Sequence, residues 1–219
     1  MSTPSASWTE LLRRALAEAD WPVAEGALQR LLLLTPEAPD LLDLLGYVLL
    51  MQGRFDACEA ALERALAAGS RSFWTPHKLG DAHRGRQRLT AAAEAYEQAL
   101  TWGSDSPLTV RNLLEVLVPL DPARALQRLQ QLASQQQPGW QEGACAAASS
   151  GLAPELAEWL CANGAADQTV RALVCMRRLS CLDLDSAMQL LQAIDTPWSA
   201  PLRQRLERLQ SPLPQPEGH

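Results

Sequence analysis

The chain has 219 residues, a formal net charge of −6, 47% hydrophobic residues and only 5% aromatic residues. This length is enough to bury a substantial core, and the absence of runs that alternate apolar with polar residues excludes a fold of half-buried strands and favours an all-α protein. A negatively charged chain without a basic and aromatic cluster is a poor match for nucleic acid, so we expect no nucleic-acid partner.

The N-terminal segment carries no signal for export or membrane insertion. Met1 to Ser7 contain neither a basic nor an apolar stretch, and the apolar runs further on, such as Leu31 to Leu34, are much shorter than a membrane span. We therefore expect a cytoplasmic protein that has no membrane partner. Ser7 and Glu10 have the spacing of a capping box, which predicts that the first helix begins after Ser7.

A repeat of 34 residues organises the first half of the chain. In the predicted first helices, the recurring pairs are Leu11-Leu12, Leu45-Gly46 and Leu79-Gly80. The predicted second helices keep the same interval, with Ala24-x-x-x-Leu28, Cys58-x-x-x-Leu62 and Ala92-x-x-x-Tyr96. A fixed period with two helices per unit predicts a stack of helical hairpins.

These marks resemble the tetratricopeptide repeat, whose pattern is W-x-x-L-G-x-x-Y, then A-x-x-x-F, then a closing proline. Trp8-x-x-Leu11 matches the start of the pattern, and Pro36 matches its end. The chain departs from the pattern at Leu42 and Pro76, where tryptophan is preferred, and at Ser70 and Ser104, where proline is. The resemblance implies a right-handed α-solenoid, in which Gly46 and Gly80 lie where two helices cross closely.

Local signals set the boundaries of three units, at 5–38, 39–72 and 73–106. Gly69 and Gly103 are expected to take the left-handed conformation that ends a helix. Ser106 followed by Pro107 is typical of a helix start.

The pattern weakens in a fourth unit, 107–137, and beyond it. Ala125-x-x-x-Leu129 comes one residue early, and Pro119 is expected to interrupt the first helix, so this unit is predicted to be shortened or kinked. Residues 138–211 are predicted to form divergent helical hairpins or a separate helical cap. A polar helix near 198–209 is expected to cap the array or to bind a partner. The Pro-rich tail 212–219 is expected to be disordered, and the whole array to hold about six hairpins.

No catalytic motif was found. The chain has no Gly-rich phosphate loop, no G-x-S-x-G elbow and no zinc-protease signature, so we expect no enzyme, no cofactor and no metal. His77 and Asp81 are four residues apart, which we interpret as a hydrogen bond at the surface or in a groove. The five cysteines form no C-x-x-C pair, so we expect reduced, packed thiols rather than a redox or metal site.

By the resemblance, the first helix of each hairpin lines a concave groove where partners dock. Aromatic, arginine and methionine side chains, which often dominate binding, occur at the corresponding positions. A second interpretation is that Tyr47 and Trp74 only pack between hairpins. The candidate groove residues are Arg13, Asp43, Tyr47, Met51, Trp74, His77, Asp81, Arg84, Arg111 and Glu115.

The expected function is a non-enzymatic protein–protein interaction module, such as an adaptor, scaffold or chaperone, that binds a peptide or helix of another protein. A homo-oligomer is possible. Two alternatives are a substrate-presenting arm related to larger enzymes and an enzyme with an unrecognised site in 138–211. Some proteins with these repeats clamp the acidic tail of a heat-shock chaperone. Here only Arg13 and Lys78 supply positive charge at those positions, and the asparagine pair is absent.

Overall fold

The structure is a computed structural model that describes residues 4–210. In this range the chain forms thirteen helices and no strand, which confirms the predicted all-α class. The helices are α1 (Pro4–Ala17), α2 (Trp21–Leu34), α3 (Pro39–Met51), α4 (Phe55–Ala67), α5 (Trp74–Gly85), α6 (Leu89–Thr101), α7 (Pro107–Leu120), α8 (Pro122–Ser134), α9 (Trp140–Ala148), α10 (Pro154–Ala162), α11 (Gln168–Ser180), α12 (Leu184–Gln192) and α13 (Ser199–Gln210). The tail 212–219 lies outside the described residues.

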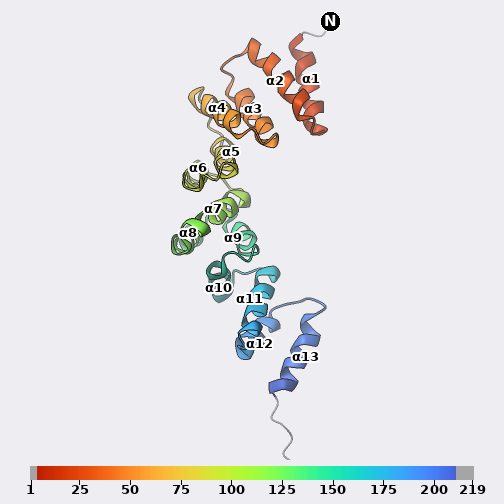
Figure 1. Cartoon of the computed structure of the whole chain (residues 1–219), viewed down its shortest axis with the longest axis vertical. Helices are drawn as coiled ribbons and strands as arrows, with labels where there is room; N and C mark the ends of the chain where they lie inside the picture. Colours follow the sequence, from red (N-terminus) through yellow and green to blue (C-terminus); the bar gives the residue numbers. More distant parts are fainter. Residues whose placement is uncertain (1–3, 211–219) are drawn as a thin grey trace, which may run out of the picture.

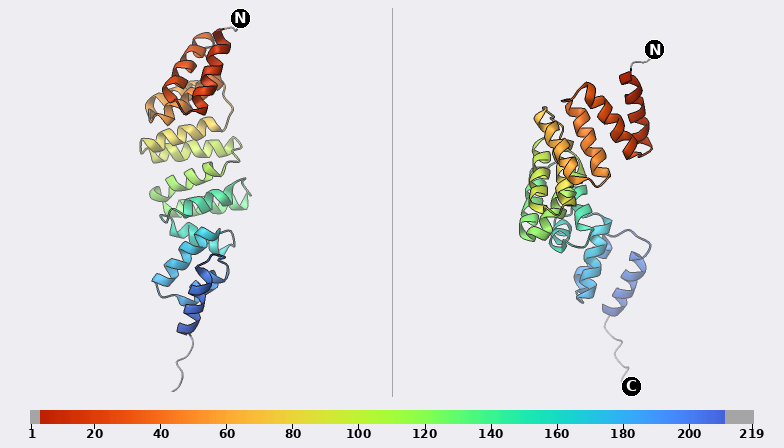
Figure 2. Two further views of the ribbon diagram at one scale, coloured as in Figure 1. Left: turned by 90° about the vertical axis from the view of Figure 1, so that its right-hand side faces the viewer. Right: turned by 45° about the horizontal axis from the view of Figure 1, so that its top comes forward.

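The helices stack along one axis in a curved array (Figure 1). The second helices α4, α6 and α8 lie on the outer side, and the first helices α3, α5, α7 and α9 lie on the inner side. Figure 2 shows the same succession of hairpins from two further directions. Between residues 4 and 210, no helix is both long and apolar enough to cross a membrane.

The first helix begins earlier than predicted. Because α1 starts at Pro4, Ser7 lies inside the helix and the predicted capping box with Glu10 is wrong. Proline suits the first turn of a helix, where its missing N–H would have no intrahelical acceptor. The start at Ser106 and Pro107 is as predicted, with Ser106 preceding α7 in an extended conformation.

Two glycines bring the paired helices of a hairpin together. A Cβ atom on Gly46 would lie 2.4 Å from the Leu62 side chain, and one on Gly80 would lie 2.5 Å from the Tyr96 ring. Leu62 and Tyr96 are fully buried and hold equivalent positions in consecutive second helices. The close crossings predicted at Gly46 and Gly80 are confirmed.

The turns follow the same period until the fourth hairpin. Ala19, Gly53 and Gln87 have φ of 54°, 71° and 59° within the first three hairpins. Between hairpins, Gly69 and Gly103 have φ of 96° and 87°, so their predicted left-handed conformation is confirmed.

The fourth turn is shorter. Only Asp121, with φ of −162°, joins α7 to α8, and its side chain accepts hydrogen bonds from the N–H groups of Ala123 and Arg124. Pro119 does not interrupt α7, which runs on to Leu120. The unit is shortened in its turn instead, which explains why the second-helix pattern comes early.

Beyond α8, small residues allow a close approach between hairpins. A Cβ atom on Gly143 would lie 2.4 Å from the Pro107 carbonyl oxygen, so α9 packs directly on the backbone of α7. A continuous hydrophobic core then extends from α6 to α11. At the far end, Leu206 of α13 packs with Leu191 and Ile194; whether α13 serves as a cap stays a prediction.

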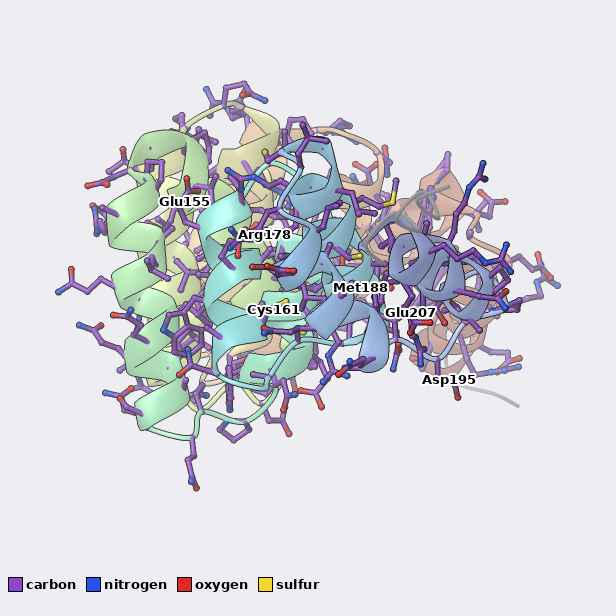
Figure 3. The ribbon with its side chains drawn as sticks, turned by 90° about the horizontal axis from the view of Figure 1, so that it is seen from below. Glu155, Cys161, Arg178, Met188, Asp195 and Glu207 are labelled. Carbon is purple, nitrogen blue, oxygen red and sulfur yellow. The ribbon has the colours of Figure 1, made fainter. Side chains whose placement is uncertain are left out.

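Figure 3 views the array from below and labels Arg178 of α11. Its guanidinium pairs with Glu158 of α10 at 2.5 Å, which joins these two helices, and with Asp183, just before α12, at 3.4 Å. The cysteines are all free: three are buried and Cys161 is half-buried, but Cys181 is exposed. Burial raises the pKa of the Cys58 thiol to about 12, as expected of a packed, unreactive cysteine.

Candidate functional site

The candidate site is the inner face, by which we mean the concave side of α1, α3, α5 and α7. Beneath this face, the junction between the second and third hairpins is fixed by buried hydrogen bonds. The Thr75 hydroxyl donates to Asp43 at 2.7 Å and accepts from Ser70 at 2.8 Å. Lys78 pairs with the other oxygen of Asp43, and its Nζ lies 6.0 Å from the centre of the Tyr47 ring.

Tyr47 contacts two other hairpins. Its ring is perpendicular to that of Trp21, with the ring centres 5.9 Å apart, and the Lys78 ammonium lies over it. Tyr47 therefore packs between hairpins and is only partly exposed. Lys78 is 13% exposed and committed to Asp43, so it has little charge to offer an acidic partner.

The next junction repeats the arrangement 34 residues later, with a histidine in place of the aspartate. Ser104 Oγ lies 2.8 Å from Thr109 Oγ1, which lies 2.9 Å from His77 Nδ1. His77 is only 4% exposed, and burial lowers the pKa of its imidazole although Asp81 opposes the shift. The predicted contact between His77 and Asp81 exists at 3.5 Å, but it is buried at a junction rather than placed at the surface.

Asp81 is the centre of this second junction. It accepts hydrogen bonds from the Tyr96 hydroxyl at 2.6 Å and from the Asn112 amide at 2.9 Å. Burial, together with the Asp81 carboxylate, raises the pKa of the Tyr96 hydroxyl, so the phenol stays protonated and donates. Asp81 thus links α5, α6 and α7.

Charged side chains at the inner face surround Glu115. Arg84 Nη1 lies 3.1 Å from one carboxylate oxygen of Glu115, and Arg111 Nε lies 2.7 Å from the other. The two guanidinium side chains are 38% and 45% exposed, whereas the Glu115 side chain is 23% exposed. The carboxylate lies inside, and the two cations face outward.

The remaining predicted residues are spread over the array. Met51 is 47% exposed and Trp74 is 38% exposed. Trp74 and Arg84 lie at opposite ends of α5, about 15 Å apart along its axis, so they do not form one patch. Arg13 is exposed on α1 and pairs with Glu10 of the same helix at 2.6 Å.

A cleft of about 700 Å³ adjoins the inner face between the third, fourth and fifth hairpins. Its polar end is formed by Arg84 and Glu115, and most of its other lining is apolar. The apolar lining includes Leu89, Val116, Val118, Pro119, Pro122, Ala147, Leu152 and Ala153. Apart from Arg84 and Glu115, these residues were not predicted as part of a site. The signals in the sequence were Ala125, which comes one residue before the repeat interval, and the prolines at 119 and 122.

The cleft lies where a periodic ion pair stops. At each earlier junction, a glutamate in the first turns of a second helix pairs with the arginine that precedes the next second helix. The pairs are Glu25 with Arg54 and Glu59 with Arg88, and the third pair of positions holds Ala93 and Asp121. Further along these helices, Glu97 of α6 pairs with Arg128 of α8 at 2.6 Å. Without a pair at Ala93 and Asp121 and with a one-residue turn, the edge of the junction is left open.

Among residues 4–210, no group of three or more histidine, cysteine or acidic side chains could hold a metal ion. The buried His77 and the partly buried Asp81 have the hydrogen-bond partners described above, which commit them to the junction. The inner face and the adjoining cleft therefore present apolar surface and the partly exposed guanidinium groups of Arg84 and Arg111.

No protein-family model matches the sequence, and no curated protein matches it either. Solved structures do match. The MamA protein has a TM-score of 0.59 at 17% identity, covering 86% of this chain and 92% of that one. A tetratricopeptide repeat protein from Parabacteroides merdae has a TM-score of 0.59 at 13% identity, covering 94% and 86%. PilF from Pseudomonas aeruginosa has a TM-score of 0.55 at 19% identity, covering 94% and 91%.

Proposed function

Because the chain has the fold of the tetratricopeptide-repeat proteins, we propose that it is a non-enzymatic interaction module, an adaptor, scaffold or chaperone, that binds a peptide or helix of another protein on its inner face. The observation that carries the proposal is the exposure of Met51, Trp74 and Arg111 on first helices. These residue types are adaptable or large, and they contribute strongly when a partner covers them.

The buried junctions support the proposal in a second way. Thr75 and Thr109, which are fully buried, fix neighbouring first helices to one another through Asp43 and His77. A binding face built on fixed helices loses little conformational entropy when a partner binds. We assign Asp43, His77 and Asp81 to positioning the face, and the exposed side chains to contacting the partner.

The charge pattern does not favour a clamp for a chaperone tail. Lys78 is neutralised by Asp43. Arg13 lies two hairpins away from Lys78 and is paired with Glu10 of its own helix. Within residues 4–210, no specific contact favours a substrate-presenting arm or an enzyme in 138–211, and both stay hypotheses.

The test begins with a pulldown from the native cell, followed by titration of the purified partner. Trp74→Ala and Met51→Ala remove exposed groove side chains, and Glu63→Ala is a control on the outer helix α4, where Glu63 is exposed. We expect a loss of about 2 kcal/mol, roughly thirtyfold in affinity, for a groove residue at the centre of the contact and almost none for the control. If both groove variants bind like the wild type while Glu63→Ala does not, the partner lies on the outer side.

A further inference from the structure

The cleft between the third, fourth and fifth hairpins leaves apolar surface uncovered. Leu152 in its wall is 78% exposed, and Leu120, next to the lining residue Pro119, is 42% exposed. Its volume of about 700 Å³ lies within the range of sites that enclose a compact ligand or several side chains. An uncovered apolar hollow of this kind is typical of a docking site.

At the polar end of the cleft, arginine side chains are more exposed than carboxylates. Arg84 and Arg111 flank Glu115 and expose 38% and 45% of their side chains, whereas Glu115 and Asp81 expose 23% and 22%. The two arginine side chains are more exposed than the carboxylates that they pair with, so N–H groups of their guanidiniums remain accessible to a carboxylate of a partner.

The lining also distinguishes between the ways in which a peptide can dock. Addition of a strand needs a sheet edge, and residues 4–210 contain no strand. A polyproline segment docks on aromatic side chains, and the cleft lining includes none. An amphipathic helix needs an apolar hollow between helices, and this the cleft provides.

We propose that the cleft binds an acidic amphipathic helix of a partner protein. Apolar side chains spaced three or four residues apart enter the hollow between Leu89, Val118 and Leu152, and flanking carboxylates pair with Arg84 and Arg111. This inference rests on the proposed function and adds the place and the chemistry of the partner.

The probe is a phage library of random peptides of about 20 residues, long enough for a helix of about 30 Å, selected on the full chain. We expect enriched peptides to carry apolar residues three or four apart, with aspartate or glutamate beside them. A synthetic peptide with the enriched pattern should bind the wild-type chain. Its affinity for two cleft variants should be at least about tenfold lower than for the wild type.

Val118→Trp fills the hollow, and Arg111→Glu reverses an exposed charge while leaving the hollow intact. Their matched controls are Leu33→Trp, at a 73% exposed leucine on α2, and Arg71→Glu, at an exposed arginine in the loop before α5. Both controls should bind like the wild type. Thermal melts establish that each variant is folded, and Arg111→Glu decides the outcome if Val118→Trp does not fold.

Three results would overturn the inference: enriched peptides without acidic residues, binding that neither cleft variant weakens, or no enrichment at all. If the selected peptides bind the cleft variants as tightly as the wild type but bind Trp74→Ala or Met51→Ala more weakly, the proposed function stands and only the cleft assignment is wrong. Failure of the proposed function would appear separately, in the pulldown titration.

Discussion

Gly46 and Gly80, in first helices within residues 4–106, each face a side chain of their own hairpin, whereas Gly143, within residues 107–210, faces the backbone of a different hairpin. Gly46 meets Leu62 and Gly80 meets Tyr96, but Gly143 meets the Pro107 carbonyl oxygen. The sequence interval from Gly46 to Leu62 equals that from Gly80 to Tyr96, because each of these contacts is made within one repeat. Gly85, at the end of α5, instead meets the Phe55 ring of the preceding hairpin. In residues 107–210 the contact of Gly143 crosses between repeats, so the hairpins stay stacked although the interval is lost.

The largest effect is expected where the backbone itself is the neighbour. Gly143→Ala adds a Cβ atom 2.4 Å from a backbone oxygen of α7, and neither helix can rotate that contact away. We expect a loss of about 3 kcal/mol in the free energy of unfolding, measured by urea denaturation. Gly26→Ala, at a helical glycine with no neighbour within 4 Å, is the control and should stabilise by up to about 1 kcal/mol. If Gly143→Ala and Gly26→Ala changed the free energy of unfolding equally, Gly143 would not hold a close contact with α7.

A smaller loss is expected at the crossing inside a hairpin. Gly46→Leu should destabilise the chain by about 1 to 3 kcal/mol, because Leu62 can change its rotamer to make part of the space. Thermal melts measure the sign and size of the change. An unchanged or raised midpoint would mean that Gly46 does not hold a close crossing.

The third prediction concerns His77, which holds the position equivalent to Asp43. The change in stability with pH should be smaller than the loss caused by Gly46→Leu. Burial lowers the pKa of His77 below its unfolded value of about 6.5, so below that pH the unfolded chain binds more protons than the folded chain. The contribution to stability is complete above about pH 6.5 and is lost as the pH falls below it. Melts of the wild type and His77→Gln near pH 7.5 and near pH 5.5 measure it. Between pH 7.5 and pH 5.5 the melting midpoint of the wild type should fall by more than that of His77→Gln. Equal falls would mean that other groups cause the pH dependence.

The smallest effect concerns the ion pairs that stop at the cleft. Glu59→Gln removes the carboxylate that pairs with Arg86 and Arg88 and should cost no more than about 1 kcal/mol, because both arginine side chains are more than a third exposed. Glu63→Gln, at an exposed glutamate one turn later in α4, is the control and should change the melting midpoint less. If Glu59→Gln cost as much as Gly46→Leu, the loss of this pair near Pro122 would be a major cause of the open junction.

The sequence could predict what repeats locally. The interval that carries Gly46 and Gly80 defined both the helical class and the crossings, and Gly69 and Gly103 marked helix ends through their own backbone preference. It could not predict burial that depends on a distant partner. His77 fits a groove position by register, yet Thr109 and Tyr96 cover it, and nothing near His77 in the sequence indicates this.

The cleft was beyond the sequence for a related reason. The cleft forms where the turn between α7 and α8 is two residues shorter than the earlier turns and where the ion pair seen at the earlier junctions is missing. Neither feature produces a recognisable sequence motif. The pairs Ser70 with Thr75 and Ser104 with Thr109 were visible at an interval of 34 residues, and they could have indicated buried junctions.

The open junction beside Asp121 also bears on how the array responds to load. In a linear stack, each hairpin transmits force only to its neighbours, so a pull on the two ends passes through every junction in turn. The earlier junctions have an ion pair near the start of their second helices. The junction between α6 and α8 lacks a pair at that end, beside Asp121, although Glu97 and Arg128 join the two helices further along. Tension applied along the array should therefore open it first beside Asp121, widening the cleft before any hairpin unravels.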